Sequence, residues 1–172
     1  MAGSELDVVV RRAVEADLPR ITEIYNHYVR TTPITFDLEP WSVEQRRPWF
    51  AKFSDSGRHQ LLVAEEGGLV QGYAGATGFR DKAAYDPTVE TTIYLASEAT
   101  GRGIGTLLYS ALFEALAGED VHLAIAAITV PNEASIALHE RFGFSLAGVI
   151  HDVGRKFDRY WDVAWYEKRL EH

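Results

Sequence analysis

Three glycines alternate with larger residues in the stretch GRGIG, at Gly101, Gly103 and Gly105, between a β-like run and an apolar helical run. Glycine lets the backbone turn its N–H groups toward a ligand, because no Cβ atom stands in the way. A helix N-terminus behind such a loop carries a partial positive charge that favours phosphate, and Arg102 adds a cation. The spacing indicates an anion-binding loop, with a plain glycine-rich corner as the alternative.

Two common phosphate loops do not fit this stretch. The dinucleotide-binding fingerprint requires a glycine at its sixth position, where this chain has Thr106. It also requires an acidic residue at the end of the next strand, and that strand ends in AITVPN. A Walker loop needs Gly-Lys-Ser/Thr, which the stretch lacks. The sequence therefore argues against a nicotinamide-dependent dehydrogenase.

Glu90 is the first residue that could move a proton. It lies in the run TVETTIYL, whose alternation predicts a strand with Glu90, Thr92 and Tyr94 on one face. Partial burial would raise the pKa of this carboxyl toward neutrality and make it a better general base. An ordinary exposed glutamate is the alternative.

His139 is the second such residue. In the run NEASIALHERFGF it shares a predicted helix face with Asn132 and Ser135. An imidazole titrates near neutrality and can give or take a proton, whereas a surface histidine beside an apolar stripe is the alternative. His27 has no cysteine and no suitably spaced acidic or histidine partner, so the sequence predicts no metal site.

These residues depend on elements that hydrophobic periodicity predicts. We expect Asp17 to cap the first helix, Ser42 and Gln45 to form a capping box, and Gly143 to end the last helix. The order β, α, α, β, β, β, α, β, α, β, β predicts an α/β domain around a mixed sheet. Strands are expected over residues 6–13, 60–66, 69–79, 88–95, 121–130, 145–150 and 160–170, and helices over 16–30, 42–53, from the glycine run to 116, and 132–144.

The composition is that of one globular domain over residues 1–172, with a core of about 8–169. Hydrophobic residues make up 47% and charged residues 24%, as in ordinary soluble domains. The net charge of -8 argues against a nucleic-acid or membrane-surface partner. Because the chain has no cysteine, it has no disulfide, thiolate nucleophile or cysteine-ligated metal.

The two ends of the chain bear on the expected location of the protein and on residues left by cloning. The N-terminus lacks the basic start and apolar core of a signal peptide, and no stretch is apolar enough to span a membrane. We therefore expect a cytoplasmic protein. The ending LEH, residues 170–172, looks like the remnant of an expression tag, so His172 is given no chemical role.

The glycine loop resembles the acyl-CoA loop of the GCN5-related N-acetyltransferases (GNAT), Arg/Gln-x-x-Gly-x-Gly/Ala. Gly103 and Gly105 fill the glycine positions, while Thr100 departs from the Arg/Gln position and Arg102 supplies part of the missing charge. A second GNAT motif follows in order, read here as Asn132, Ser135, His139 and Gly143-Phe144. His139 stands where most of the family has tyrosine.

The resemblance extends to one branch of the family. The stretches IYNHYV, TFDLEP, AYDPTVETTIYL, GRGIGTLLY and NEASIALHERFGF are similar to the phosphinothricin and methionine-sulfoximine acetyltransferases. That branch also carries histidine at the tyrosine position. The similarity runs from about Val8 to Arg169, nearly the whole chain.

This resemblance implies a GNAT fold, with a mostly antiparallel twisted sheet of about seven strands and about four helices. It implies direct transfer of acetyl from acetyl-CoA to the amino group of a small amino-acid-like acceptor, without a metal. It also implies a homodimer, for which the aromatic stretch RYWDVAWYEKRL offers apolar area. Polyamine, aminoglycoside or peptide N-terminal acceptors remain alternatives, as does a non-catalytic acyl-CoA-binding module.

The resemblance also assigns residues. Glu90 is the general base, directly or through water, and His139 protonates the leaving thiolate or relays the proton of the amine. Arg80 is expected to meet the acceptor carboxylate, since a guanidinium suits a carboxylate bidentately. Phe36, Phe79 and Tyr85 either wall the acceptor pocket or belong to the core. The acetyl-CoA residues are Ile93, Tyr94, Leu95, Gly101, Arg102, Gly103, Ile104, Gly105, Thr106, Asn132 and Ser135.

Overall fold

The computed structural model describes residues 7–171, so the expected tag residue His172 lies outside the described residues. Within this range seven strands form one sheet, in the order β1-β2-β3-β4-β5-β7-β6. All neighbouring strands are antiparallel except β4 and β5, which are parallel. The strands are β1 (Val8–Arg12), β2 (Gln60–Glu66), β3 (Leu69–Gly78), β4 (Thr88–Leu95), β5 (Leu123–Val130), β6 (Ser145–Lys156) and β7 (Arg159–Arg169).

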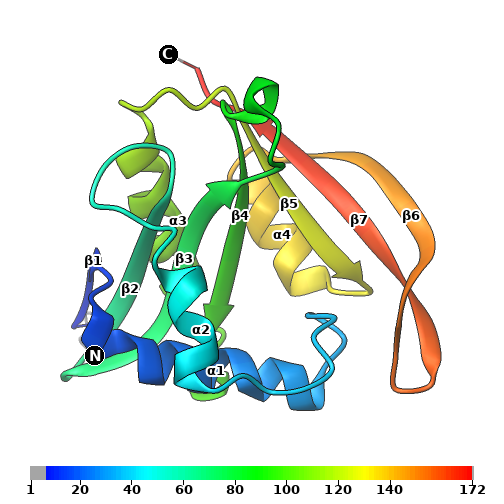
Figure 1. Ribbon diagram of the computed structural model, residues 1–172, viewed down its shortest axis with the longest axis horizontal. Helices are drawn as coiled ribbons and strands as arrows, with labels where there is room; N and C mark the ends of the chain where they lie inside the picture. The colour runs from blue at the N-terminus through cyan, green and yellow to red at the C-terminus, as the bar shows by residue number, and fades with distance from the viewer. Residues whose placement is uncertain (1–6, 172) are drawn as a thin grey trace, which may run out of the picture.

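Four α-helices and three short 3₁₀ turns complete the described chain. The helices are α1 (Leu18–Thr31), α2 (Val43–Phe50), α3 (Ile104–Leu116) and α4 (Glu133–Arg141). Helices α1 and α2 lie on one side of the sheet and α3 and α4 on the other (Figure 1). The order of strands and helices confirms the predicted α/β class with a mixed, mostly antiparallel sheet.

Local hydrogen bonds explain where the helices begin and end. Ser42 and Gln45 form the predicted capping box at the start of α2, and Gly143, with a φ of +84°, follows the end of α4 as expected. Asp17 does occupy the position before α1, but its carboxylate does not cap that helix. It accepts hydrogen bonds from the Arg11 guanidinium and from Val14 N–H instead, since a bidentate guanidinium is the stronger partner.

The parallel strands β4 and β5 separate soon after they pair. Their register covers only Thr88 to Glu90 on β4 and Leu123 to Ile125 on β5. Beyond Glu90, β4 continues alongside β3 and β5 continues alongside β7, and the two strands diverge (Figure 1). The sheet is therefore split in its middle.

The last two strands form a long hairpin that projects from the body of the molecule (Figure 1). The prediction for β6 was too short, because the strand runs on from Ile150 to Lys156 through mostly exposed residues and a register shift. Its far end holds the loop after α1. Lys156 is buried and donates to the carbonyl of Thr35 at 2.8 Å, and Phe36 packs against Gly154.

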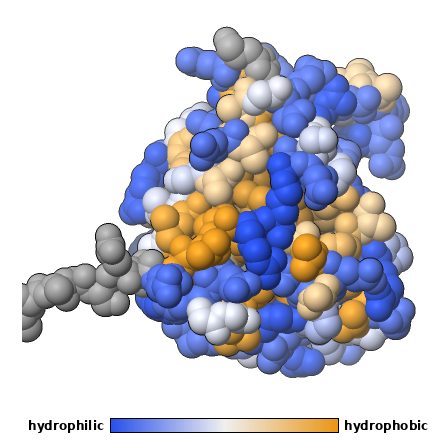
Figure 2. Space-filling model, turned by 90° about the vertical axis from the view of Figure 1, so that its left-hand side faces the viewer, coloured by the Kyte–Doolittle hydropathy of each residue, from blue (hydrophilic) through white to orange (hydrophobic). Residues whose placement is uncertain are grey.

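The surface on the β1 side combines hydrophobic and hydrophilic areas (Figure 2). Strand β1 forms that edge of the sheet, and Val9 is among its exposed apolar side chains. Charged Arg11 and Glu65 flank the same edge and pair with each other, which discourages pairing with another strand. Among residues 7–171, no helix is long and apolar enough to cross a membrane.

Gly154 gives the first testable prediction. A Cβ atom there would lie 2.2 Å from the Phe36 ring, whereas at Gly148 on the same strand no atom lies within 4 Å of that position. We expect Gly154→Ala to lower the free energy of unfolding by about 1–3 kcal/mol through overpacking. Gly148→Ala is the matched control, and urea unfolding measures both. Equal stability of the two variants would contradict the Phe36 contact.

Candidate active site

A cavity of about 230 Å³ occupies the split between β4 and β5. Its walls come from β4 (residues 90–94), from β5 (residues 126–129) and from the loop after α1 (residues 34–36). Tyr109 on α3 and Ser135 and His139 on α4 close it from one side. The cavity thus collects both residues that the sequence singled out for proton transfer, Glu90 and His139.

Glu90 enters the cavity from the side of α1 and α2. It shares a strand face with Tyr94, whose ring packs against Tyr25 of α1 at 5.2 Å between centroids. The carboxyl is half-buried, and this burial alone raises the pKa of Glu90 above its ordinary value. A carboxylate with a raised pKa is a better proton acceptor near neutral pH.

His139 enters from the opposite side and is only 3% exposed. Its Nδ1 lies 2.7 Å from the carbonyl oxygen of Ser135, which can only accept, so Nδ1 carries the proton. Its Nε2 lies 2.8 Å from the hydroxyl of Tyr109. Burial lowers the pKa of His139, so the neutral imidazole accepts the Tyr109 proton at Nε2. Sequence reasoning missed Tyr109, because nothing in its helix signals a partner on α4.

The open edge of β4 offers unpaired backbone groups. The backbone oxygen of Thr88 and the N–H of Ala96 form hydrogen bonds on the side of β3. The backbone oxygen of Pro87 faces the other way and accepts hydrogen bonds from the start of β5. Because backbone groups alternate along a strand, those of Ile93 and Leu95 point into the split and those of Tyr94 point to β3. Leu95 O already accepts from the Tyr28 hydroxyl. The predicted strand-like contact with a ligand therefore fits Ile93 and Leu95, and Tyr94 contributes its side chain only.

The glycine loop lies between β4 and α3. Gly101 and Gly103 adopt φ values of +73° and +82°, which side chains rarely tolerate. Gly105 packs closely, since a Cβ there would lie 3.4 Å from Leu138. The loop thus carries the conformations expected of a backbone cradle at a helix N-terminus.

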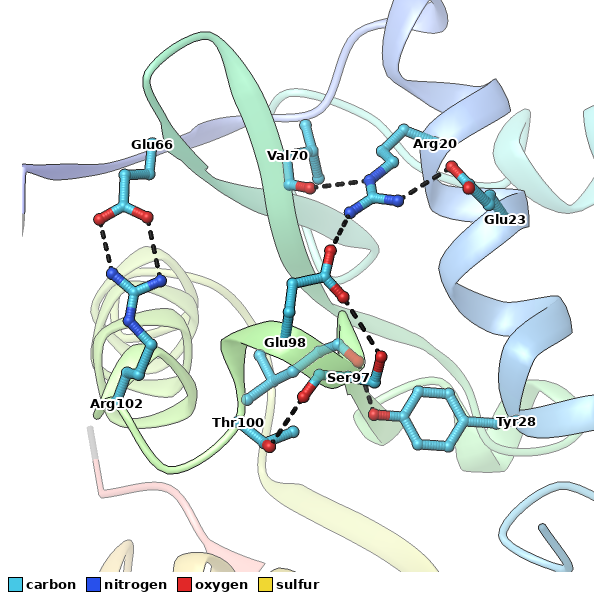
Figure 3. Close-up of polar contacts among 10 residues, drawn as sticks. Arg20, Glu23, Tyr28, Glu66, Val70, Ser97, Glu98, Thr100 and Arg102 are labelled. Carbon is cyan, nitrogen blue, oxygen red and sulfur yellow. Dashed lines mark hydrogen bonds and ion pairs between the residues drawn. The ribbon is translucent and has the colours of Figure 1, made fainter. Parts of the chain in front are cut away.

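Two arginines lie beside this loop: Arg102, which the sequence resemblance assigned to acetyl-CoA, and Arg141, for which it made no prediction. Arg102 does not project freely, because its guanidinium pairs bidentately with Glu66 at 2.6 and 3.0 Å (Figure 3). Arg141, on α4, instead donates to the Thr106 hydroxyl at 3.1 Å. Arg141 lies close to the glycine loop because α4 packs beside α3, and no local sequence motif indicates this packing.

The segment that leads into the loop is tied to the rest of the fold. Glu98 accepts from Arg20 of α1 at 2.8 Å, and Arg20 also donates to the carbonyl of Val70 on β3 (Figure 3). Thr100 closes the 3₁₀ turn by donating to Ser97 O at 3.0 Å. The approach to the glycine loop is therefore rigidly connected to α1 and β3.

The predicted acceptor residues are only partly brought together. Phe36 lines the Glu90 cavity, while Arg80, Phe79 and Tyr85 do not. They follow the end of β3, where Phe79 contacts the Tyr85 ring at 5.7 Å and Arg80 lies 5.0 Å above the Phe79 ring. Arg80 is exposed and borders a separate hollow that also includes Lys52.

The arrangement can hold an elongated ligand with an anionic end. Such a ligand would lie along the open edge of β4, with its anion at the glycine loop and its other end near Glu90. Within residues 7–171, no three histidine, aspartate or glutamate side chains are grouped so that they could hold a metal ion.

A split parallel strand pair followed by a glycine loop and a helix defines an acetyltransferase fold of the GNAT class. The acetyltransferase (GNAT) domain model matches residues 10–165, and the chain belongs to this family. This confirms the resemblance inferred from the motifs.

Individual relatives agree with the family. The chain is 55% identical to a phosphinothricin N-acetyltransferase of Streptomyces coelicolor, over 95% of this chain and 97% of the relative. It is 35% identical to an L-methionine sulfoximine/L-methionine sulfone acetyltransferase of Pseudomonas aeruginosa, over 94% of each chain. The crystal structure of a phosphinothricin acetyltransferase from Sinorhizobium meliloti in complex with AcCoA superposes with a TM-score of 0.90 at 38% identity, covering 95% of this chain and 89% of that one.

The buried neutral His139 makes a prediction about stability and pH. Its pKa is lowered in the folded state, so an unfolded chain takes up a proton near pH ~6.5 that the folded chain does not. The contribution of the neutral His139 to the free energy of unfolding is therefore complete above that pH. It is lost as the pH falls through the pKa that His139 has in the folded protein. In His139→Phe the free energy of unfolding should depend less steeply on pH between 7 and 5, by at most about 1.4 kcal/mol per pH unit.

The exposed His27 supplies the control for this measurement. His27→Phe should keep the wild-type slope, because this side chain is exposed and its replacement leaves the burial of His139 unchanged. Denaturant unfolding at several pH values compares the two variants. Identical slopes for both would contradict a neutral buried His139.

Proposed function

We propose that the protein transfers the acetyl group of acetyl-CoA to the amino group of a small amino-acid-like acceptor, of the phosphinothricin or methionine sulfoximine kind. The observation that carries this proposal is the split between β4 and β5, which aligns the glycine loop, the open edge of β4 and Glu90 on one path. The names of the relatives, at 55% and 35% identity over nearly the whole chain, support this acceptor class.

Acetyl-CoA would bind along that path as an added strand. Its pyrophosphate would lie at the loop from Gly101 to Thr106, and its pantetheine would pair with the backbone of Ile93 and Leu95. Asn132 uses its side-chain oxygen to cap α4, at 3.3 Å from Ser135 N, so its amide nitrogen can donate to the pantetheine arm. One domain of about residues 8–169 would carry the whole site.

The reaction would proceed by direct attack. Glu90, directly or through a water molecule, takes a proton from the ammonium group of the acceptor. The free amine then attacks the thioester carbonyl, the C–N bond forms and the C–S bond breaks, and the second proton of the nitrogen goes to the departing thiolate. His139 would relay this proton at the unprotonated Nε2, where it shares a hydrogen bond with the Tyr109 hydroxyl.

The acceptor would approach from the side of α1 and α2, where Glu90 lies. Phe36 would form part of its wall, and Arg80 would bind its carboxylate from the loop after β3, with Phe79 and Tyr85 beside it. A polyamine, an aminoglycoside or a peptide N-terminus would use the same reaction. Release of free CoA with a panel of amines separates these acceptors, and no release with any amine would indicate an acyl-CoA-binding module.

Glu90→Gln tests the proposed base. The amide keeps the shape but accepts no proton, so turnover should fall about 100- to 10,000-fold. Because the pKa of Glu90 is raised by burial, the wild-type rate should fall on the acidic side of neutrality, and this limb should vanish in the variant. Steady-state rates from pH 5 to 9 measure both effects, and near-wild-type turnover would remove Glu90 from the mechanism.

Acetyl-CoA binding is the control for this experiment. Glu90→Gln should keep the thermal shift produced by acetyl-CoA, whereas Gly103→Glu should lose it by placing a negative charge in the anion loop. Gly118→Glu adds the same charge beyond the other end of α3, in open space, and should keep the shift. A full shift in Gly103→Glu would show that the loop does not hold the pyrophosphate.

We also propose a cytoplasmic homodimer. Strand β6 exposes several apolar side chains, among them Leu146 at 54%, Ile150 at 47% and Val153 at 49%. Apolar side chains exposed in this number on one strand are the support for an interface on β6. Ile150→Asp should shift the sedimentation coefficient toward the monomer value at micromolar concentration, while Asp152→Asn, exposed on the same strand, should not. A wild-type protein that sediments only as a monomer would reject the dimer.

A further inference from the structure

A second cavity, of about 340 Å³, lies on the side of α1 and α2. Thr92 and Tyr94 of β4 line both this cavity and the Glu90 cavity, so the two adjoin. Arg46 of α2 borders it, and we call it the Arg46 cavity. None of the acceptor residues proposed above lines this space.

Arg46 is the most unusual group in its wall. The side chain is only 6% exposed, and its guanidinium is stacked between the rings of Tyr25 at 4.3 Å and Trp49 at 3.8 Å. Its Nε and Nη2 atoms are buried without a hydrogen-bond partner among residues 7–171. Arg46 is also absent from the ion pairs formed within that range.

The neighbours of Arg46 are mainly hydrogen-bond donors. The Tyr73 hydroxyl is likewise buried without a hydrogen bond of normal geometry in the described chain. Burial raises the pKa of Tyr73 more than the nearby Arg46 guanidinium lowers it, and burial also raises the pKa of Tyr94, so both keep their protons. Lys52 adds a second cation to the wall.

Asp37 is the one carboxylate among the residues lining this cavity. Its Oδ2 accepts from the Tyr25 hydroxyl and from Trp41 Nε1, and within residues 7–171 it forms no ion pair with Arg46. An uncompensated buried charge is costly, and cation–π stacking offsets only part of that cost. The donors and cations therefore favour an anionic oxygen group as the missing partner.

We propose that the Arg46 cavity binds the distal end of the acceptor side chain, and that this end is an oxyanion such as a phosphinate or carboxylate. The proposal rests on the proposed acetyl transfer. Oxyanions suit a guanidinium, which presents its N–H groups in a planar fork. A distal ammonium group, as in a polyamine, would meet Arg46 and Lys52 and be repelled.

The distance along β4 indicates that the distal group of the acceptor, and not its α-carboxylate, reaches the Arg46 cavity. Thr92 and Tyr94 lie two and four residues from Glu90, or about 7 and 13 Å along a strand. The reacting amine must be near Glu90, and the α-carboxylate is attached to the same carbon as that amine. Only the far end of a side chain extends from Glu90 to the Arg46 cavity, which leaves the α-carboxylate to Arg80.

The test compares Arg46→Met with Arg47→Met. Arg47 is the next residue of α2, but it is exposed and pairs with Glu44 on the surface. In Arg46→Met the KM for phosphinothricin, whose side chain ends in an anionic phosphinate, should rise about 10- to 100-fold. The KM for methionine sulfone, whose side chain ends in an uncharged group, should rise less than about fivefold. Arg47→Met should change neither value.

Equal KM increases for both acceptors in Arg46→Met, or no increase for phosphinothricin, would overturn the proposal. Arg46→Lys guards against a folding defect, since it keeps the charge without the planar fork and should give an intermediate KM for phosphinothricin. Acetyl-CoA should stabilise every variant to the wild-type extent if the fold is intact.

A binding measurement separates this proposal from the proposed function. Deaminated phosphinothricin, 4-(methylphosphinico)butanoate, cannot be acetylated but keeps the distal phosphinate at its original distance from the carboxylate. Calorimetry should detect its binding to the wild-type protein with acetyl-CoA present and a loss of about 10-fold or more in affinity in Arg46→Met. Equal binding to both proteins overturns the Arg46 proposal. Failure of the wild type to acetylate phosphinothricin or methionine sulfone overturns the proposed function, whatever calorimetry shows.

Discussion

The separation of β4 from β5 beyond Glu90 and Ile125 is the constraint on which the rest of the structure depends. A strand inside a sheet normally satisfies its backbone on both sides, and unpaired groups at such a position are costly unless something pairs with them. Here β3 and β7 hold the two strands from outside, so the split cannot close by sliding. The fold thus maintains an unfilled strand position at its centre, which a CoA arm can occupy.

The same split brings the two faces of the sheet into chemical contact. Glu90 belongs to the side of α1 and α2, and His139 to the side of α3 and α4. Elsewhere the continuous sheet keeps side chains of opposite faces apart. Burial acts oppositely on the two groups, raising the pKa of Glu90 and lowering the pKa of His139. The first shift makes Glu90 a better proton acceptor, and the second keeps the imidazole of His139 neutral, with Nε2 free of a proton of its own.

Much of the fold could be predicted from the sequence, because its signals are local. Alternating β-branched runs, the capping box of Ser42 and Gln45, and Gly143 after α4 each act within a few residues. The glycine loop and the family motifs likewise located Gly103, Glu90 and His139. What could not be predicted depends on contacts between distant segments.

Three cases show this limit. The Arg102 side chain pairs with Glu66, 36 residues away, so its type alone could not reveal its direction. Tyr109 meets His139 only because α3 and α4 pack side by side. In the sequence, Arg46 is indistinguishable from the other charged residues of a polar helix. In the structure it is a buried cation, because the rings of Tyr25 and Trp49 cover its guanidinium. Long-range packing thus decides which charges remain free for a ligand.

The hairpin of β6 and β7 has a consequence for the order in which the enzyme is built during translation. Gly154 and Lys156 hold the loop around Thr35 and Phe36, and Val163 lines the Glu90 cavity itself. Among the strands of residues 7–171, β5 pairs with β4 only from Leu123 to Ile125 and with β7 from Leu123 to Val130. When the first 140 residues have left the ribosome, every residue assigned to acetyl transfer has been made. The active site is still incomplete at that point, because β6 and β7 are missing. Activity begins only when the last segment of the chain folds back onto the first.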